Sequence, residues 1–181
     1  FAKSTGCSKG KGGSMHLVAP DISIPAVNTA IVGSQISHAV GAGLAIKLRG
    51  ENKVSVVFFG DAGTDTGIFY ESTNFAALKK LPVIFICENN FYSSHVHLKE
   101  RQPINDLYLK TQHMMRSYQV DGNNVIEVFK AVQEAVKRAR NGEGPTLIEC
   151  ITYRHRGHVG PNWDIHDAEM MSQEERTKWA K

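Results

Sequence analysis

Residues 54–67 read VSVVFFGDAGTDTG, and this stretch decides the fold. Its first six residues form a continuous apolar run, which predicts a parallel β-strand covered on both faces. The glycines and Asp61 that follow predict a tight turn, and residues 67–80 have the length of a helix. A second apolar run, 83–87, predicts another strand, which leads into Glu88-Asn89-Asn90. The order strand, turn, helix, strand therefore predicts two parallel strands joined by a helical crossover.

Polar side chains stand where each of these two strands ends. Asp61 follows the first strand, and Asn90 follows the second. In open α/β sheets the carboxyl ends of the strands line one crevice, where ligands bind. We therefore expect the oxygen atoms of Asp61 and Asn90 to face one site.

The rest of the chain continues the alternation of strands and helices. Further helices are expected over 33–48, 105–117 and 124–140, and a last strand over 146–152. The predicted fold class is α/β, a doubly wound parallel sheet with helices on both faces. We expect a single domain over 1–181, with a glycine-rich loop region at 1–30 and a polar tail at 159–181.

Composition narrows the classes of function. The 181 residues are 41% hydrophobic and 22% charged, as expected of a globular domain. The 21 Lys and Arg residues are spread among 18 Asp and Glu, so we expect no nucleic-acid partner. No apolar run approaches the roughly 20 residues of a membrane-spanning helix, so we expect no membrane segment. Cys7, Cys87 and Cys150 have no paired spacing, which indicates a reducing compartment. The start, Phe-Ala-Lys, leads us to expect a piece of a larger chain.

Three phosphate-binding interpretations of the turn can be compared. A P-loop needs a Lys followed by Ser or Thr at the helix start, and the turn has neither in that order. A dinucleotide site would bring a pyrophosphate onto the Asp61 carboxylate, and two anions about 4 Å apart repel by several kcal/mol at a dielectric constant of roughly 20. A divalent metal between them reverses the sign. Oxygen ligands favour Mg²⁺, so the turn predicts a magnesium-diphosphate site, with Asp61 as a simple helix cap as the alternative.

Several sequence motifs of the chain also show a resemblance to a known family. Gly60-Asp61, followed by a helix, a strand and Asn89-Asn90, resembles the thiamin-diphosphate motif. Residues 74–90, NFAALKKLPVIFICENN, are similar to the alpha subunit of 2-oxoacid dehydrogenase first components of the pyruvate and acetoin type. The other matching segments, in order, are Gly10 to His16, Ile31-Val32-Gly33-Ser34-Gln35, Val120-Asp121-Gly122 and Thr152-Tyr153-Arg154.

The resemblance implies a thiamin-diphosphate-binding fold and a set of site residues. The implied Mg²⁺ ligands are Asp61, the Asn90 side chain and the main-chain carbonyl of Tyr92. Main-chain groups of Ala30 and Val32 are implied to meet the aminopyrimidine ring. The amides of Ala62 and Gly63, with Arg154, are implied to hold the diphosphate, and Asp61 and Asn90 to reach it through the metal. His158 is the implied catalytic residue.

The resemblance also implies an activity and partners. The expected enzyme is an oxidoreductase subunit that decarboxylates a small 2-oxoacid and passes the acyl group to a lipoyl-bearing acyltransferase. It is expected to need a beta subunit, in an alpha2-beta2 heterotetramer, and to lie in the cytoplasm, or in the mitochondrial matrix if the source is eukaryotic. Two alternatives stay open: transketolase-like ketol transfer or carboligation, and a non-catalytic remnant or scaffold subunit.

Two positions depart from the family pattern. The family has Gly-Asp-Gly, whereas Asp61 is followed here by Ala62. If that position needs a positive φ, alanine costs on the order of 1 kcal/mol. After His158 the mammalian pyruvate enzymes carry a phosphorylated serine, whereas this chain has Val159-Gly160-Pro161, so the sequence does not support regulation there.

Overall fold

The computed structural model describes residues 3–12, 18, 28–155 and 157–158. His16 and the expected tail at 159–181 lie outside the described residues. In chain order the elements are α1 (Ser34–Leu48), β1 (Ser55–Gly60), η1 (Asp61–Asp65, a 3₁₀ helix), α2 (Gly67–Leu78), β2 (Val83–Asn89), β3 (Tyr92–Ser93), β4 (Val96–His97), α3 (Leu98–Arg101), η2 (Leu107–Lys110, a 3₁₀ helix), β5 (Arg116–Asp121), α4 (Val125–Arg140) and β6 (Thr146–Ile151).

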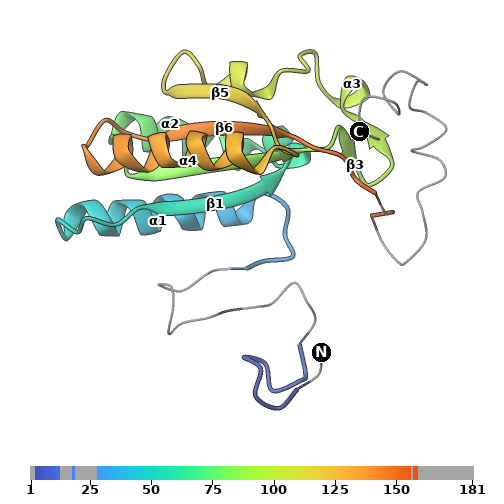
Figure 1. The fold of residues 1–181 in the computed structure, drawn as a ribbon, viewed down its shortest axis with the longest axis horizontal. Helices are drawn as coiled ribbons and strands as arrows, with labels where there is room; N and C mark the ends of the chain where they lie inside the picture. Colours follow the sequence, from blue (N-terminus) through green and yellow to red (C-terminus); the bar gives the residue numbers. More distant parts are fainter. Residues whose placement is uncertain (1–2, 13–17, 19–27, 156, 159–181) are drawn as a thin grey trace.

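The main sheet has four parallel strands in the order β1-β2-β6-β5, and a short hairpin, β3-β4, stands apart from it (Figure 1). Gly60 at the end of β1 pairs with Glu88 near the end of β2. Asn89 at the end of β2 pairs with Ile151 at the end of β6. The carboxyl ends of these three strands therefore meet at one edge of the sheet, and the expected parallel α/β sheet is confirmed.

The core is divided between the two faces of the sheet, because successive side chains of a strand point to opposite sides. One cluster joins Ile36 and Val40 of α1 and Phe69 of α2 to Val57 and Phe59 of β1. The other joins Ala131 and Ala135 of α4 to alternate residues of β2 and β6. Helices thus cover both faces of the sheet, as predicted.

The close packing of α1 depends on one small residue. A Cβ atom added to Gly43 would come within 2.4 Å of the Val83 Cγ2 atom. The glycine lets the helix backbone lie directly against the side chain of β2, and Ser55 on β1 donates a hydrogen bond to the Ala39 carbonyl at 2.8 Å. These contacts fix the middle of α1 relative to the strands that carry the candidate site.

The prediction of a helix over 105–117 was wrong. Only Leu107–Lys110 is helical there, as a single 3₁₀ turn, and Arg116–Asp121 forms β5. The backbone from Arg116 onward pairs with β6 in parallel register from Arg116↔Thr146 to Asp121↔Ile151. Because a neighbouring strand satisfies its hydrogen-bonding groups, this segment extends the sheet in place of a helix.

The expectation that the run 54–59 is covered on both faces was also wrong. Val57 and Phe59 are buried, but Val56 is 41% exposed and Phe58 is 60% exposed. β1 is an edge strand, and α4 packs over β2, β6 and β5 on that side. Phe129 of α4 is exposed as well. Within the described residues this side of the sheet therefore has an uncovered apolar margin.

Two further expectations can be compared with the structure. Cys87 and Cys150 are buried free thiols, and burial raises the pKa of the Cys150 thiol to about 11. Among the described residues, no helix has both the length and the apolar character needed to cross a bilayer.

Candidate functional site

The turn after β1 holds Asp61 inside the protein. Asp61 is the first residue of η1, and its side chain is 2% exposed. The Thr64 hydroxyl donates to the Asp61 carbonyl at 2.8 Å, and the Thr66 hydroxyl donates to the Gly63 carbonyl at 2.7 Å. These two bonds close the turn from within, so the backbone of 61–66 keeps the Asp61 carboxylate at the end of the strand.

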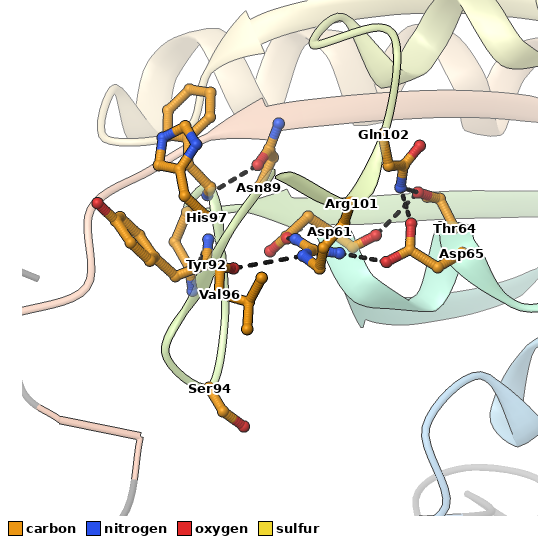
Figure 2. Close-up of polar contacts among 12 residues, drawn as sticks. Asp61, Thr64, Asp65, Asn89, Tyr92, Ser94, Val96, His97, Arg101 and Gln102 are labelled. Carbon is orange, nitrogen blue, oxygen red and sulfur yellow. Dashed lines mark hydrogen bonds and ion pairs between the residues drawn. The ribbon is translucent and has the colours of Figure 1, made fainter. Parts of the chain in front are cut away.

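A cation faces the two acidic side chains of this turn. The Arg101 guanidinium from α3 lies between Asp61 and Asp65 and pairs with one carboxylate oxygen of each (Figure 2). Burial raises the pKa of the Asp61 carboxyl, and the charge of Arg101 opposes that rise. A buried carboxylate needs a positive partner, and Arg101 provides it here.

The segment that carries Arg101 makes further hydrogen bonds, several of them to the same turn. Gln102 is buried and donates its amide hydrogens to the Thr64 hydroxyl, at 2.8 Å, and to Asp65. The Arg101 Nε atom also donates to the Val96 carbonyl at 3.3 Å. Thus the end of the β3-β4 hairpin, α3 and the turn after β1 form one polar cluster.

The turn after β2 is built around a pair of buried polar residues. Asn89 and Glu149 are fully buried, and the Asn89 side-chain amide donates to Glu149 Oε1 at 2.7 Å. The Asn89 side-chain oxygen accepts the Phe91 amide at 2.9 Å. Next to it, the Asn90 side-chain oxygen accepts the Tyr92 amide at 3.0 Å. The residues expected to bind a metal, Asn90 and Tyr92, therefore belong to one hydrogen-bonded turn.

Arg154 lies beside this turn. Its Nη2 atom donates to the Ser94 carbonyl at 2.8 Å, and its guanidinium carbon is 5.8 Å from the centre of the Tyr92 ring. The loop after β6 thus places a cation next to the main chain that follows β2. A residue predicted to hold a diphosphate is brought to a residue predicted to hold the metal, although the role of each stays a prediction.

The segment before α1 reaches the same edge of the sheet. Gly33 has φ 82, and a Cβ atom there would come within 2.8 Å of the Thr66 hydroxyl oxygen. The left-handed backbone and the close approach both require glycine. Gly33, which follows Val32, therefore lies against Thr66 at the end of η1, and both Ala30 and Val32 are exposed.

His158 and Ala62 complete the predicted set. His158 is exposed on the loop after β6, and within the described residues it makes no hydrogen bond. Ala62 lies in the 3₁₀ helix beside Gly63 and is not among the described residues with positive φ. The condition under which alanine would strain this turn is therefore not met.

The donor chemistry of the site fits a hard divalent cation that also binds phosphate. Asp61 offers a carboxylate, and the Asn90 oxygen keeps a second lone pair after accepting the Tyr92 amide. One carboxylate with amide and main-chain oxygens is typical of Mg²⁺ that retains water or phosphate ligands. The described residues contain no cluster of three or more His, Cys, Asp and Glu side chains suited to a metal.

Comparison with known proteins identifies the family. The dehydrogenase E1 component model matches residues 1–177. The chain belongs to the dehydrogenase E1 component family. Its match to that family extends through the loop of Arg154 and His158, which agrees with the resemblance found in the motifs.

Several E1 alpha subunits are similar to this E1-family chain. The alpha subunit of the acetoin:2,6-dichlorophenolindophenol oxidoreductase of Bacillus subtilis is 42% identical, over 87% of this chain and 47% of its own length. The pyruvate dehydrogenase E1 alpha subunit of Porphyra purpurea is 37% identical, over 99% of this chain and 53% of its own length. The chain therefore spans about half the length of these relatives. Other relatives are named as chloroplastic or mitochondrial forms.

A solved structure supports the fold. The putative thiamin diphosphate-dependent enzyme of Mycobacterium smegmatis matches with a TM-score of 0.54 and 21% identity, over 72% of this chain and 25% of its own. At this identity the likeness concerns the fold alone, and it agrees with the parallel α/β sheet described above.

Two residues of the site were not predicted from the sequence. Arg101 has no local signal, because it reaches Asp61 from 40 positions away. Glu149 has one: it is a single acidic residue inside the apolar strand run Thr146-Leu147-Ile148-Glu149-Cys150-Ile151. A charge in a buried strand needs polar partners, so its position could have indicated a buried polar network.

Proposed function

We propose that this chain is the cofactor-binding part of the alpha subunit of a 2-oxoacid dehydrogenase first component, which uses thiamin diphosphate and Mg²⁺. The observation that carries the proposal is the meeting of two turns. Asp61 ends β1, the Asn89–Tyr92 turn ends the neighbouring strand β2, and Arg154 lies on Tyr92. The family match and the alpha subunits among the relatives support the same assignment.

The roles of the residues follow from their chemistry. Asp61, the Asn90 side-chain oxygen and the Tyr92 carbonyl would hold the metal. The amides of Ala62 and Gly63 and the Arg154 guanidinium would hold the diphosphate, since main-chain N–H groups and guanidinium groups both bind phosphate oxygens. Main-chain groups of Ala30 and Val32 would orient the aminopyrimidine ring.

The cofactor, when bound, supplies a nucleophilic thiazolium carbon and an electron sink for decarboxylation. The protein supplies position and charge. His158 lies on the exposed loop that also carries Arg154, so it would work beside the reacting carbonyl group and donate or accept a proton there. The substrate is a small 2-oxoacid of the pyruvate class or a related carbonyl compound such as acetoin.

Partners form part of the proposal. Several relatives are named as alpha subunits, which supports a beta-type subunit in an alpha2-beta2 heterotetramer and a lipoyl-bearing acyltransferase that accepts the acyl group. The uncovered apolar margin formed by Phe58 and Phe129 agrees with further protein contacts. The proposed location is the bacterial cytoplasm, or the mitochondrial matrix in a eukaryote.

The test is calorimetric titration of the chain with thiamin diphosphate and MgCl₂, with and without a beta-type subunit. Asp61→Ala should weaken Mg²⁺-dependent binding at least about 100-fold, because the only carboxylate of the set is lost, while circular dichroism stays that of the parent. Asp106→Ala, an exposed acidic residue, is the control. Equal binding by Asp61→Ala and the parent would contradict the site. No binding by the parent under either condition would favour a non-catalytic subunit.

A further inference from the structure

Glu149 is a buried carboxylate that touches none of the residues assigned to the cofactor. It lies on β6 in the middle of the sheet, and its exposed fraction is 0%. Burial raises the pKa of its carboxyl, and hydrogen bonds from Asn89, Tyr108, Leu107 and Gln119 oppose that rise. Both carboxylate oxygens of Glu149 accept hydrogen bonds: Oε1 accepts one from the Asn89 side-chain amide, and Oε2 accepts one from the Tyr108 main-chain amide at 3.0 Å. Donor groups therefore face both oxygens, and these contacts are the ones that an accepting carboxylate makes.

The carboxylate fixes the orientation of Asn89. An ionised carboxylate only accepts hydrogen bonds, so Asn89 must turn its amide hydrogens toward Glu149. Its side-chain oxygen then faces the other way, where it accepts the Phe91 amide at 2.9 Å. The Asn89 carbonyl accepts the Thr152 amide at 2.9 Å, which ties the same residue to the end of β6.

The turn that Asn89 holds contains a residue with a strained backbone conformation. Phe91 has φ 69, a left-handed conformation that is unfavourable for a residue with a Cβ atom. The bond from the Phe91 amide to Asn89 and the bond from the Leu98 amide to the Phe91 carbonyl, at 2.7 Å, hold it there. Asn90 and Tyr92 stand on either side of this strained residue.

We propose that Glu149 is a positioning residue for the metal site: through Asn89 it fixes the turn that presents the oxygens of Asn90 and Tyr92 toward Asp61. The inference rests on the proposed function for the identity of the metal, but the connection from Glu149 to the turn stands on the contacts alone. Outer groups that orient metal ligands typically change metal affinity 10- to 100-fold when they are removed.

The connection can be tested without any metal or cofactor. Glu149→Gln keeps the shape of the side chain but adds an amide group that donates. If its one oxygen stays on the Tyr108 amide, its NH₂ faces Asn89, and the Asn89 side chain must reverse. We expect hydrogen exchange at the Phe91 and Tyr92 amides, followed by nuclear magnetic resonance, to quicken at least about tenfold. The Ile126 amide, which donates to the Asn124 side chain at 3.2 Å, should keep its rate.

Binding of MnCl₂ in the presence of thiamin diphosphate, followed by electron paramagnetic resonance, tests the functional step. Glu149→Gln should weaken Mn²⁺ binding at least about tenfold. The matched control is Ile148→Ala. Ile148 directly precedes Glu149 on β6 and is equally buried, but its side chain packs on the α4 face. This control lowers the stability of the same strand without touching Asn89, so its Mn²⁺ affinity should stay within about twofold of the parent.

Asn89→Ala provides a second variant should Glu149→Gln fail to fold, because it breaks the same connection and leaves Glu149 with the Tyr108 and Gln119 donors. Unchanged exchange at Phe91 and Tyr92 in the variant that folds overturns the inference. So does parental Mn²⁺ affinity in that variant, or an equal loss of affinity in Ile148→Ala. If the parent binds no Mn²⁺ either with or without a beta-type subunit, the proposed function fails, and the exchange rates still decide whether Glu149 holds the turn.

Discussion

The turn after β1 and the turn after β2 lie at one edge of the sheet but are held in different ways. In the first, none of the residues Asp61–Asp65 has a positive φ, and the charge of Asp61 is balanced by Arg101 from a separate short helix. In the second, Phe91 has φ 69, and the holding group is Glu149, inside the sheet itself.

The groups that hold the two turns differ in their freedom to move: Arg101 is a partly exposed side chain, whereas Glu149 is enclosed in the sheet. Arg101 is a side chain on α3 and is 13% exposed, so it can move away from Asp61 without any change in the main sheet. Glu149 is fully buried and bonded to Asn89 of β2 and to the Tyr108 amide of η2, so it cannot leave without opening the sheet. In the proposed metal site, the first turn would supply the charge and the second would supply the geometry.

The largest expected effect concerns the charge of Arg101. Arg101→Gln leaves Asp61 buried beside a neutral side chain, and we expect a loss of about 3 kcal/mol in the free energy of unfolding, measured with urea by circular dichroism. If a metal ion can replace Arg101, then 1 mM MnCl₂ should stabilise Arg101→Gln more than it stabilises the parent. The opposite order would show that Arg101 helps to bind the metal.

A surface arginine gives the control for this measurement. Arg49 lies 4.0 Å from Glu51, and its side chain is mostly exposed. Exposed ion pairs contribute little, so Arg49→Gln should change the free energy of unfolding by less than about 0.5 kcal/mol. A similar loss in both variants would show that Arg101 acts only through general charge, and the distinction between the two turns would then not hold.

The sequence predicted the fold well where the signal is local. Periodic apolar residues and the glycines around them predicted α1, α2 and α4 to within about two residues, and apolar runs did the same for the core of β1, β2 and β6. β5 was missed because Arg116–Asp121 carries no strong strand pattern; its extended form depends on pairing with β6. The exposure of Phe58 was missed for the same reason, since an apolar run does not reveal which strand lies at the edge.

The candidate site, like the fold, was predicted from the sequence only where the signal is local. Asp61, Asn90 and Arg154 stand next to strand ends, so their meeting at one edge follows from the order of the strands. Arg101 and Glu149 act on residues 40 and 60 positions away, and no local pattern specifies such pairs. The sequence therefore predicted which side chains meet at this edge better than it predicted the groups that balance or orient them.

A pH series tests the second turn with a smaller effect. Folding raises the pKa of the Glu149 carboxyl, so between its unfolded value, near 4.5, and its higher folded value the folded state binds more protons than the unfolded state. The contribution of Glu149 to stability therefore falls as the pH rises through that window, by up to about 1.4 kcal/mol per pH unit. Glu149→Gln lacks this contribution. We expect the free energy of unfolding of the parent, minus that of Glu149→Gln, to decrease above pH 4.5.

The subtraction removes the effect of the other buried acid. Burial raises the pKa of the Asp61 carboxyl too, but Asp61 is present in both proteins and cancels in the difference. Measurements in EDTA keep divalent metals from adding a pH dependence of their own. A difference that stays constant across this range, or increases with pH, would show that the Glu149 carboxyl is not desolvated by the sheet as the structure indicates.

The smallest expected effect concerns the relaxed backbone of the first turn. Because Ala62 lies in a 3₁₀ helix without positive φ, Ala62→Gly should relieve no strain. It should cost about 0.5 kcal/mol in the free energy of unfolding, through the greater freedom of the unfolded chain, and leave thiamin diphosphate binding with MgCl₂ within about twofold. Lys80→Gly is the matched control: Lys80 is exposed with φ 46, so glycine there should stabilise the chain by up to about 1 kcal/mol. Cofactor binding that tightens more than about fivefold in Ala62→Gly would mean that the first turn must strain on binding, and the contrast with Phe91 would be lost.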